Sequence, residues 1–305
     1  MSIEEELERL GQTRRSARAE RNFALADEIR DQILALGYEI IDKPEGFSFA
    51  PIEGTPKKSK RFPSYQRIGD IRTLPGKSHQ VSIALIIDGF ADDACESVLK
   101  IKEFAPEDVG IVLLINGEQE SAPLEGLIDG RTQVISIQEK SGWGVAANTL
   151  LKVIGSKIVV IMDPSTRFTG DAITPILGKF ESYEAVGWKG GLVNLSDNWR
   201  SVDDRGPGDV DVLFSYFLAL NREAALEAGG FNARAIYYRN ADIEFSLRLR
   251  QAHGRLLQMD LPLEQARHHG YYNVDPHFRE EESQRTYNRI LERFRGKDEI
   301  LVPRR

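Results

Sequence analysis

The stretch GWGVAANTLLKVIGSKIVVIMDPSTRF, residues 142–168, carries the pattern that decides the fold. Its first half has apolar residues at helical spacing behind two glycines, and its second half contains the apolar run KIVVIMD, typical of a buried strand. A helix that leads directly into such a strand is the unit from which parallel α/β sheets are built. The run ends at Asp163, which the carboxyl end of the strand would present at the edge of the sheet.

Similar units precede this stretch. Apolar runs and helical patterns alternate along the chain at 81–88, 92–104, 110–116, 133–137 and 143–154. The alternation predicts an α/β domain over residues 80–305 with a doubly wound, mostly parallel sheet, whose ligands lie at the carboxyl ends of the strands. Asp88, Asn116 and Asp163 all stand at such ends.

The second half of the chain has a different sequence pattern. Helices are expected over 221–228 and 240–252. Asn221 can cap the first of them, and Gly229 and Gly230 permit the left-handed backbone that ends it.

A last helix is expected in FREEESQRTYNRILERFRG, residues 278–296. It has apolar residues on one face and dense charge on the other, so it should pack back on the domain or form a homodimer contact.

Composition and charge indicate a soluble globular protein. The chain has 305 residues, 41% of them hydrophobic, and a net charge of −7, which argues against a surface devoted wholly to nucleic acid. A single cysteine, Cys95, excludes an intramolecular disulfide and a cysteine-cluster metal site. The charged N-terminal segment lacks the apolar stretch of a signal peptide, and no later apolar run approaches the roughly 18 residues of a membrane span. We therefore expect a cytoplasmic protein without a transmembrane span.

Residues 1–50 are predicted to form a small helical hairpin. Apolar residues recur at helical spacing through residues 2–36, and a short extended segment at 37–42 then leads to a turn rich in Pro and Gly. Two interpretations stay open: the helices pack on a neighbour or a second subunit, or they contact RNA.

Residues 51–79 are predicted to be a basic linker. Between residues 55 and 80 the chain holds seven Lys or Arg, one acid and three prolines, without an apolar period. Such a segment is either merely solvated or lies along phosphates. An RNA contact through residues 13–77 is therefore an expected partner interaction.

The N-terminal pattern FALADEIRDQILALGYEIIDKPEG, with the residues around it at 13–50, resembles the C-terminal helical region of cysteinyl-tRNA synthetases. In that family an alanine-aspartate-x-isoleucine-arginine helix leads to a glycine and a D-x-P-x-G turn. The resemblance implies tRNA or another RNA as the partner of this hairpin.

Four segments of the larger domain occur in a recognisable order: KSGWGVAANTLLKVIGSKIVVIMDPSTRF, FSYFLALNREAALEAGGFN, NADIEFSLRLR and ARHHGYYN. Over residues 80–275 this order resembles the inverting, family-2-like nucleotide-sugar glycosyltransferases of the GT-A fold. The resemblance implies a hexosyltransferase-type enzyme that moves a sugar from a nucleoside-diphosphate donor to an unknown hydroxyl acceptor. It also implies a divalent metal, Mn or Mg.

The same resemblance assigns candidate residues. Asp242 matches the catalytic base, which must take a proton from the acceptor hydroxyl during in-line attack. The resemblance assigns metal ligation to Asp163 and to His268, which is followed directly by a second histidine, His269. The residues implied in donor binding are Asp88, Asn116, Gly142, Asn148, Asp163, Ser165 and Arg248.

Three acidic positions of the family pattern are altered, and Ser165 replaces the second aspartate of the metal motif. The other two changes are Ala241 for a glutamate and Ile115 for an aspartate. One carboxylate can approach a ribose hydroxyl or a metal-bound water, but a divalent ion on a diphosphate prefers more anionic ligands. The alternative function is therefore a catalytically degenerate, glycosyltransferase-like binding protein that associates with RNA.

Asp242 also has a non-catalytic interpretation. Acids near a helix start favour the helix dipole, and Glu244 with Arg248 has the spacing of an i,i+4 ion pair.

Overall fold

The computed structural model describes residues 3–20, 22–35, 38–43, 46–51, 60–62, 79–118, 122–266 and 274–304. The chain divides into two compact units, Met1–Lys60 and Arg61–Arg305, so the division falls inside the expected linker. Within the described ranges, no helix is both long and apolar enough to cross a membrane.

The smaller unit pairs two helices with a β-hairpin. Helices α1 (Ile3–Ala19) and α2 (Phe23–Ala35) are followed by β1 (Tyr38–Lys43), which pairs antiparallel with β2 (Gly46–Pro51). The helices agree with the predicted hairpin, whereas β2 was not expected from the sequence. The buried core of this unit consists of Leu7, Leu10, Ile29, Ile33 and Ile40.

Close packing and one ion pair tie the β-hairpin to α1. A Cβ at Gly11 would lie 2.3 Å from the Phe47 ring, so the ring packs directly against the glycine and would have to shift for a larger residue. Arg14 donates two hydrogen bonds, of 2.7 and 3.2 Å, to the two carboxylate oxygens of Asp42. This bidentate pair fixes the hairpin strand against the helix.

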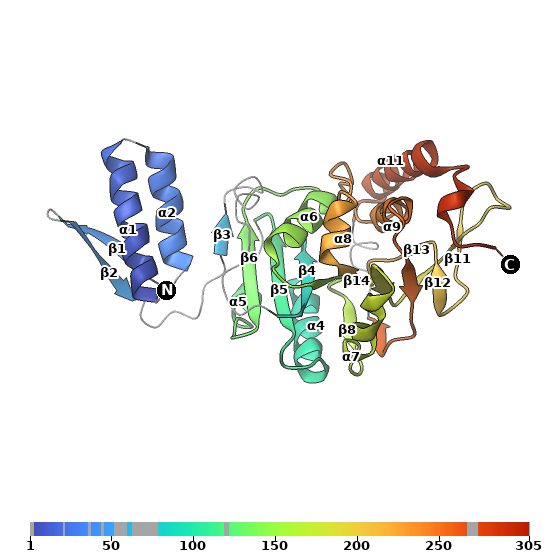
Figure 1. Cartoon of the computed structure of the whole chain (residues 1–305), viewed down its shortest axis with the longest axis horizontal. Helices are drawn as coiled ribbons and strands as arrows, with labels where there is room; N and C mark the ends of the chain where they lie inside the picture. Colours follow the sequence, from blue (N-terminus) through green and yellow to red (C-terminus); the bar gives the residue numbers. More distant parts are fainter. Residues whose placement is uncertain are drawn as a thin grey trace. The chain divides into compact units, whose positions relative to one another are not determined.

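The larger unit is built on a nine-stranded sheet (Figure 1). Its strands, in spatial order, are β12 (Gly208–Val210), β15 (Leu256–Gln258), β9 (Ala185–Gly187), β14 (Phe217–Asn221), β7 (Ile158–Met162), β4 (Val81–Ile87), β5 (Gly110–Asn116), β6 (Thr132–Ile137) and β3 (Lys60–Phe62). Strands β7, β4, β5 and β6 run parallel, and β14 is antiparallel to both of its neighbours. The predicted α/β class with a central, mostly parallel sheet is confirmed.

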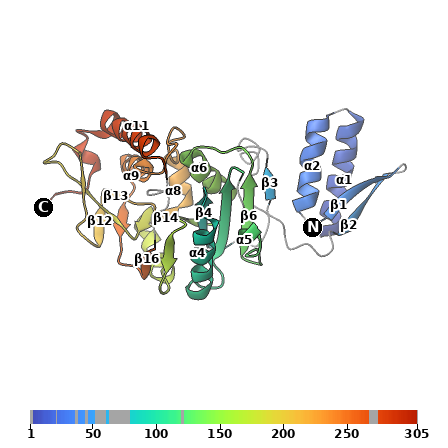
Figure 2. The same ribbon diagram turned by 180° about the vertical axis from the view of Figure 1, so that it is seen from behind.

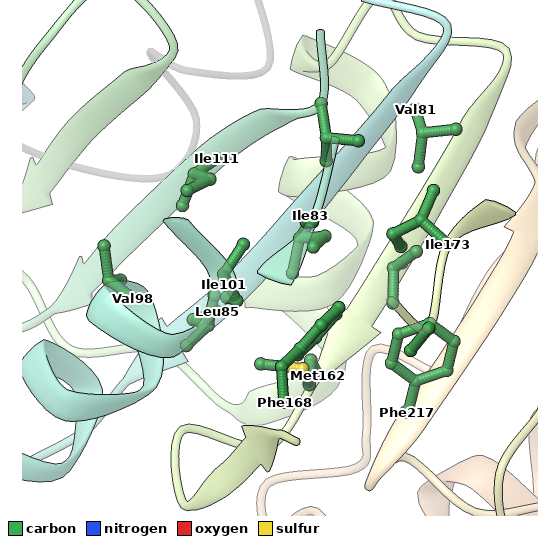
Figure 3. Close-up of a cluster of buried hydrophobic side chains, with 14 of the residues drawn as sticks. Val81, Ile83, Leu85, Val98, Ile101, Ile111, Met162, Phe168, Ile173 and Phe217 are labelled. Carbon is green, nitrogen blue, oxygen red and sulfur yellow. The ribbon is translucent and has the colours of Figure 1, made fainter. Parts of the chain in front are cut away.

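One face of the sheet is covered by α4 (Ala91–Phe104) and α7 (Thr174–Leu177). Side chains of a strand alternate between the two faces, so every second residue of β4 points to this side. Figure 3 shows the resulting cluster, whose labelled members are Val81, Ile83, Leu85, Val98, Ile101, Ile111, Met162, Phe168, Ile173 and Phe217.

The opposite face is covered by α6 (Trp143–Val153), α8 (Arg222–Glu227) and α9 (Ala241–Gln251) (Figure 2). The alternate residues of β4, Ala84 and Ile86, pack into this second cluster. With helices on both faces, the parallel strands have no solvated side, which explains their continuous apolar sequences.

Short strands and a long helix complete the unit. A three-stranded sheet has the order β11 (Val202–Asp203), β10 (Gly190–Val193) and β13 (Val212–Leu213), and β16 (Leu263–Gln265) pairs with β8 (Thr166–Phe168). The remaining helical segments are α5 (Ala122–Glu125), η1 (Gly178–Glu181), α11 (Pro276–Phe294) and η2 (Asp298–Ile300).

Helix α11 packs back on the domain, one of the two roles expected for it. Its Ile290 and Phe294 are buried in a cluster with Trp199 and Leu247. Beyond the helix, the chain end reaches the fully buried Asp211. This carboxylate accepts hydrogen bonds from the amides of Val193 and Val302, both at 2.7 Å, and from Arg304 Nη2 at 2.5 Å.

Candidate functional site

The carboxyl ends of the parallel strands bring three expected residues to one edge of the sheet. Strand β4 pairs Ile87 with Ile115 of β5 and Leu85 with Met162 of β7. Asp88, Asn116 and Asp163 follow or end these strands. Ligands of open α/β sheets bind outside this edge, so it is the candidate donor site.

Asp88 and Phe90 stand at the end of β4. The Asp88 carboxylate is paired with Lys140 Nζ at 2.7 Å, and both side chains are about half exposed or more. Phe90 has a left-handed backbone with φ 57°, and 38% of its surface is exposed. A bulky residue rarely adopts this conformation, and such strained residues cluster at functional sites. Phe90 was not among the residues expected from the sequence.

Asn116 is buried and holds the loop before α6. Its Nδ2 donates to the Ser141 carbonyl and its Oδ1 accepts from the Ser141 amide, both at 3.0 Å. Both bonds join the end of β5 to the segment before α6, so the side-chain amide of Asn116 is used within the protein.

At the end of β7, Asp163 is held by the serine that replaces the second aspartate of the metal motif. Asp163 Oδ1 accepts from the Ser165 amide at 2.8 Å and from the Ser165 hydroxyl at 2.5 Å. The same hydroxyl accepts from Gln265 Nε2 at 2.6 Å. Ser165 is 3% exposed, so its oxygen faces the protein.

Asp242 lies at the start of α9 and is 7% exposed. Its Oδ2 accepts from the amide and the hydroxyl of Ser215, at 2.8 and 3.1 Å. Burial raises the pKa of the Asp242 carboxyl, while the hydrogen bonds from Ser215 and Ile243 oppose that shift. A carboxylate with a raised pKa is the better proton acceptor near neutral pH.

Tyr216 lies within electrostatic reach of both carboxylates. The Asp163 amide donates to the Tyr216 carbonyl at 3.3 Å, and the neighbouring Ser215 binds Asp242. The pKa of Tyr216 is raised by burial and then by the charges of Asp242 and Asp163, whereas the Arg239 charge lowers it. Two candidate residues that stand 79 positions apart in the sequence thus approach the same segment.

Tyr238 belongs to the same neighbourhood. Burial, a hydrogen bond with Tyr237 and the charge of Asp163 all raise its pKa. Both tyrosines, like Arg239 and Gln265, were missed in the sequence. In the sequence, only their closeness to expected residues along the chain pointed to them. Their position at the site depends on the pairing of β14 with β7 and of β16 with β8, which the sequence does not reveal.

Three other expected donor-binding residues converge on the loop 229–236. Asn148 makes two 2.8 Å hydrogen bonds with the backbone of Phe231, and Arg248 Nη1 donates to the carbonyls of Gly229 and Gly230. A Cβ at Gly142 would lie 3.0 Å from Ile236 Cα. These residues hold a protein loop.

The expected ion pair between Glu244 and Arg248 is not the principal contact of either residue. Glu244 accepts from Asn232 Nδ2 at 2.5 Å and pairs with Arg289 at 3.4 Å, which links α9 to α11. Arg248 instead binds loop carbonyls, and burial lowers its pKa.

The expected metal site is only partly covered by the described residues, which contribute the Asp163 carboxylate. Across the described part of the chain, no group of three or more His, Cys, Asp or Glu side chains is arranged to hold a metal. Ser165, the expected second ligand position, directs its hydroxyl to Asp163 and Gln265. The expected ligand His268 and its neighbour His269 lie outside the described residues.

Two surface hollows of about 590 and 360 Å³ lie elsewhere. The larger runs along α11 and the smaller lies between α9 and the chain end; neither is lined by Asp163 or Asp242.

The sheet order and the helices on both faces define a GT-A-like α/β fold with a central, mostly parallel sheet. No family model matches the sequence. Two solved structures share the fold at low sequence identity. The structure of GalNAc-T7 with UDP, GalNAc and Mn²⁺ is 13% identical, with a TM-score of 0.55 over 72% of this chain. The mannosyltransferase PcManGT from Pyrobaculum calidifontis, in complex with GDP-Man and Mn²⁺, is 15% identical, with a TM-score of 0.50 over 68% of this chain.

The present chain spans about half the length of the first structure, 48%, and 65% of the second. At these identities the likeness establishes the fold, and a reaction has to be argued from the site.

Proposed function

We propose that this protein is an inverting glycosyltransferase that transfers a sugar from a nucleoside-diphosphate donor to a hydroxyl acceptor. The observation that carries the proposal is the convergence of Asp163 and Asp242 on the segment containing Ser215 and Tyr216. A fold shared with two transferases, whose structures contain UDP or GDP-Man, supports a nucleoside-diphosphate donor.

Asp242 serves as the base. Its Oδ2 is held by Ser215, which fixes the direction of the carboxylate, and burial raises its pKa toward the range useful for proton transfer. The acceptor oxygen gives its proton to Asp242 while it attacks the sugar carbon. The bond to the diphosphate breaks on the opposite face, so the configuration at that carbon inverts.

The donor occupies the strand-end edge. Asp163 provides a carboxylate for the ribose or the diphosphate side, and Asp88 and Phe90 lie where a nucleoside would meet the end of β4. A divalent ion between Asp163 and His268 remains a prediction from the family resemblance, and no step of the transfer is routed through it.

The test is donor turnover by the purified full chain. UDP- and GDP-sugars are incubated with the protein, and release of the nucleoside diphosphate is measured with and without added glycan or alcohol acceptors. We expect release that Asp242→Asn reduces by about 100-fold or more, the range for loss of a general base. Donor binding without turnover in any acceptor mixture would contradict the proposal.

A second candidate is a non-catalytic, GT-A-like binding protein. It is favoured by the use of Gly142, Asn148 and Arg248 to hold the loop 229–236. In that case nucleotide binding survives in Asp242→Asn and no donor is consumed by the unaltered chain.

RNA contact through residues 13–77 and homodimer formation stay predictions. Most of the basic linker, residues 52–59 and 63–78, lies outside the described residues. Gel-shift measurements with tRNA at several salt concentrations test the RNA contact, since phosphate binding weakens steeply with salt.

A further inference from the structure

The edge of the sheet that carries Asp163 continues across two further strands. Strand β14 runs antiparallel to both β7 and β9, so it starts beside the ends of these two strands. Tyr216 directly precedes β14, and its carbonyl accepts from the Asp163 amide at 3.3 Å. Trp188 directly follows β9, and its amide donates to the Phe217 carbonyl at 3.2 Å. Tyr216 and Trp188 therefore lie at the same edge as the candidate donor site.

Three aromatic side chains meet at this part of the edge. The centre of the Tyr216 ring lies 6.5 Å from that of Trp188 and 6.3 Å from that of Phe214, with the rings nearly perpendicular. All three residues are partly buried, so each keeps part of its surface open to solvent. Lys189 Nζ lies 4.8 Å from the centre of the Trp188 ring. We call Trp188, Tyr216 and Phe214 the aromatic wall.

The aromatic wall adjoins the proposed base. Ser215 lies between Phe214 and Tyr216 in the chain, and it donates its amide and its hydroxyl to Asp242 Oδ2 at 2.8 and 3.1 Å. The acceptor hydroxyl has to reach Asp242 from the side opposite the departing diphosphate. The rest of an acceptor molecule bound there would contact the neighbours of Ser215, which are rings of the wall.

The surroundings of the wall favour a carbohydrate over a peptide or a lipid chain. Strand β14 is paired on both sides, by β7 and β9, so an extended peptide cannot join the sheet beside the base. An alkyl chain packed on the wall would bury the charge of Lys189, which costs free energy. A sugar ring has a face of C–H bonds that packs on an aromatic ring, and its hydroxyls stay available to polar groups and water.

We propose that the acceptor is a carbohydrate whose ring stacks on the aromatic wall, chiefly on Trp188, with the reacting hydroxyl directed to Asp242. The inference rests on the proposed transferase function and adds to it the class of acceptor. The acceptor oxygen forms a bond to the sugar carbon of the donor and gives its proton to the Asp242 carboxylate. The bond from that carbon to the diphosphate oxygen breaks, and the nucleoside diphosphate leaves with the electron pair.

The first experiment measures saccharide binding to the full chain. Saturation-transfer NMR is recorded with cellobiose and with N,N′-diacetylchitobiose, each in the presence of UDP or GDP. Trp188→Leu keeps an apolar side chain but removes the ring, whereas Trp188→Tyr keeps a ring. Thermal melts establish that the variants fold.

Phe104→Leu is the matched control. Phe104 is also partly buried, packs on the same apolar cluster as Trp188 and has a lysine, Lys100, 5.4 Å from the centre of its ring. It ends α4, ahead of the start of β5, and so lies away from the strand ends that carry the site.

We expect saturation transfer to the C–H protons of at least one disaccharide. Trp188→Leu should weaken this binding about tenfold, the loss expected for one aromatic contact, whereas Trp188→Tyr should weaken it by about threefold or less. Phe104→Leu should leave it unchanged. In turnover with the saccharide that is accepted, Trp188→Leu should raise the acceptor KM far more than it changes kcat, because it removes binding made equally in the ground state and the transition state.

Other outcomes separate the two proposals. Donor turnover that requires Asp242 and a peptide or lipid alcohol, with neither disaccharide bound or accepted, would overturn the carbohydrate acceptor and leave the transferase proposal intact. Equal binding and equal acceptor KM for Trp188→Leu and the unaltered chain would reject the aromatic wall as the contact. Saccharide binding that depends on Trp188, without release of a nucleoside diphosphate, would retain the wall as a carbohydrate site and overturn the proposed function.

Discussion

The side-chain amide of Asn148 binds the backbone of Phe231 twice, donating to its carbonyl and accepting from its amide, each at 2.8 Å. This pair joins α6 to the turn after α8, across 83 positions of the sequence. The turn leaves no room for another side chain, because a Cβ at Gly230 would lie 2.4 Å from Asn148 Oδ1. The asparagine that resembles a donor-binding residue is thus a structural clamp.

Asn148→Ala should therefore lower the free energy of unfolding. It leaves the amide and carbonyl of Phe231, a residue 1% exposed, without these partners, at a cost of about 2–4 kcal/mol. Urea denaturation measures the loss. Asn288→Ala, on an exposed face of α11, is the control and should change stability by less than about 0.5 kcal/mol. An unchanged unfolding midpoint for Asn148→Ala would show that the clamp is not needed.

Gly144→Ala tests how tightly the loop 229–236 approaches α6. An added Cβ would lie 2.1 Å from the Asn232 carbonyl oxygen, so the loop or the helix must shift. We expect a loss of about 1–3 kcal/mol, the usual cost of overpacking. Gly178→Ala is the matched control, since its Cβ would meet nothing within 4 Å and its φ of −69° suits any residue. Equal melting temperatures for the two variants would contradict this prediction.

Arg304→Ala should destabilise the larger unit through Asp211. The Asp211 carboxylate is 0% exposed; it would keep its two amide donors but lose the guanidinium of Arg304, its ion-pair partner. Because the arginine itself is 31% exposed, the cost should be about 2 kcal/mol, below that of a fully buried pair.

Arg205→Ala provides the comparison for that ion pair. Its guanidinium is 3.9 Å from Asp203 and 71% exposed, so removing it should cost at most about 0.5 kcal/mol. If chemical denaturation gave the two arginine variants the same free energy of unfolding, the Arg304–Asp211 pair would contribute no more to stability than the exposed pair.

The raised pKa of Asp242 predicts two opposite pH dependences. The folded state holds this proton more tightly than the unfolded chain, whose ordinary value is 3.8. The resulting stability is complete below pH 3.8 and is lost as the pH rises through the folded pKa. Activity needs the unprotonated base, so kcat/KM should rise over the same interval.

Asp242→Asn separates the two effects. Unfolding measured at several pH values should show the variant gaining stability relative to the unaltered chain as the pH increases. A kcat/KM profile that stays flat through the pH interval in which this stability changes would argue against Asp242 as the base.

Much of the fold could be predicted because its signals are local. The apolar runs at β4, β5 and β7 are continuous, as strands buried on both faces must be, and Asn221 caps α8 as its side chain suggested. The class of fold followed from their alternation with helices.

The site was less accessible to sequence reasoning because its contacts join distant segments. Ser165 and Gln265 are 100 positions apart, and nothing in either segment indicates the pairing of β8 with β16. Asp211 is fully buried, because its partners come from the end of the chain, and no local pattern around it indicates that contact. Matching residue types alone could not distinguish Asn148 as a ligand contact from Asn148 as a clamp.

The contact between Asp211 and the chain end has a practical consequence for anyone producing this protein. Val302 and Arg304 donate hydrogen bonds to a buried carboxylate, so a purification tag fused directly after them would lie next to contacts of the core. A fusion at the amino terminus would extend from α1, in a unit with its own apolar centre. Affinity handles and fluorescent reporters therefore belong at the amino end of the chain.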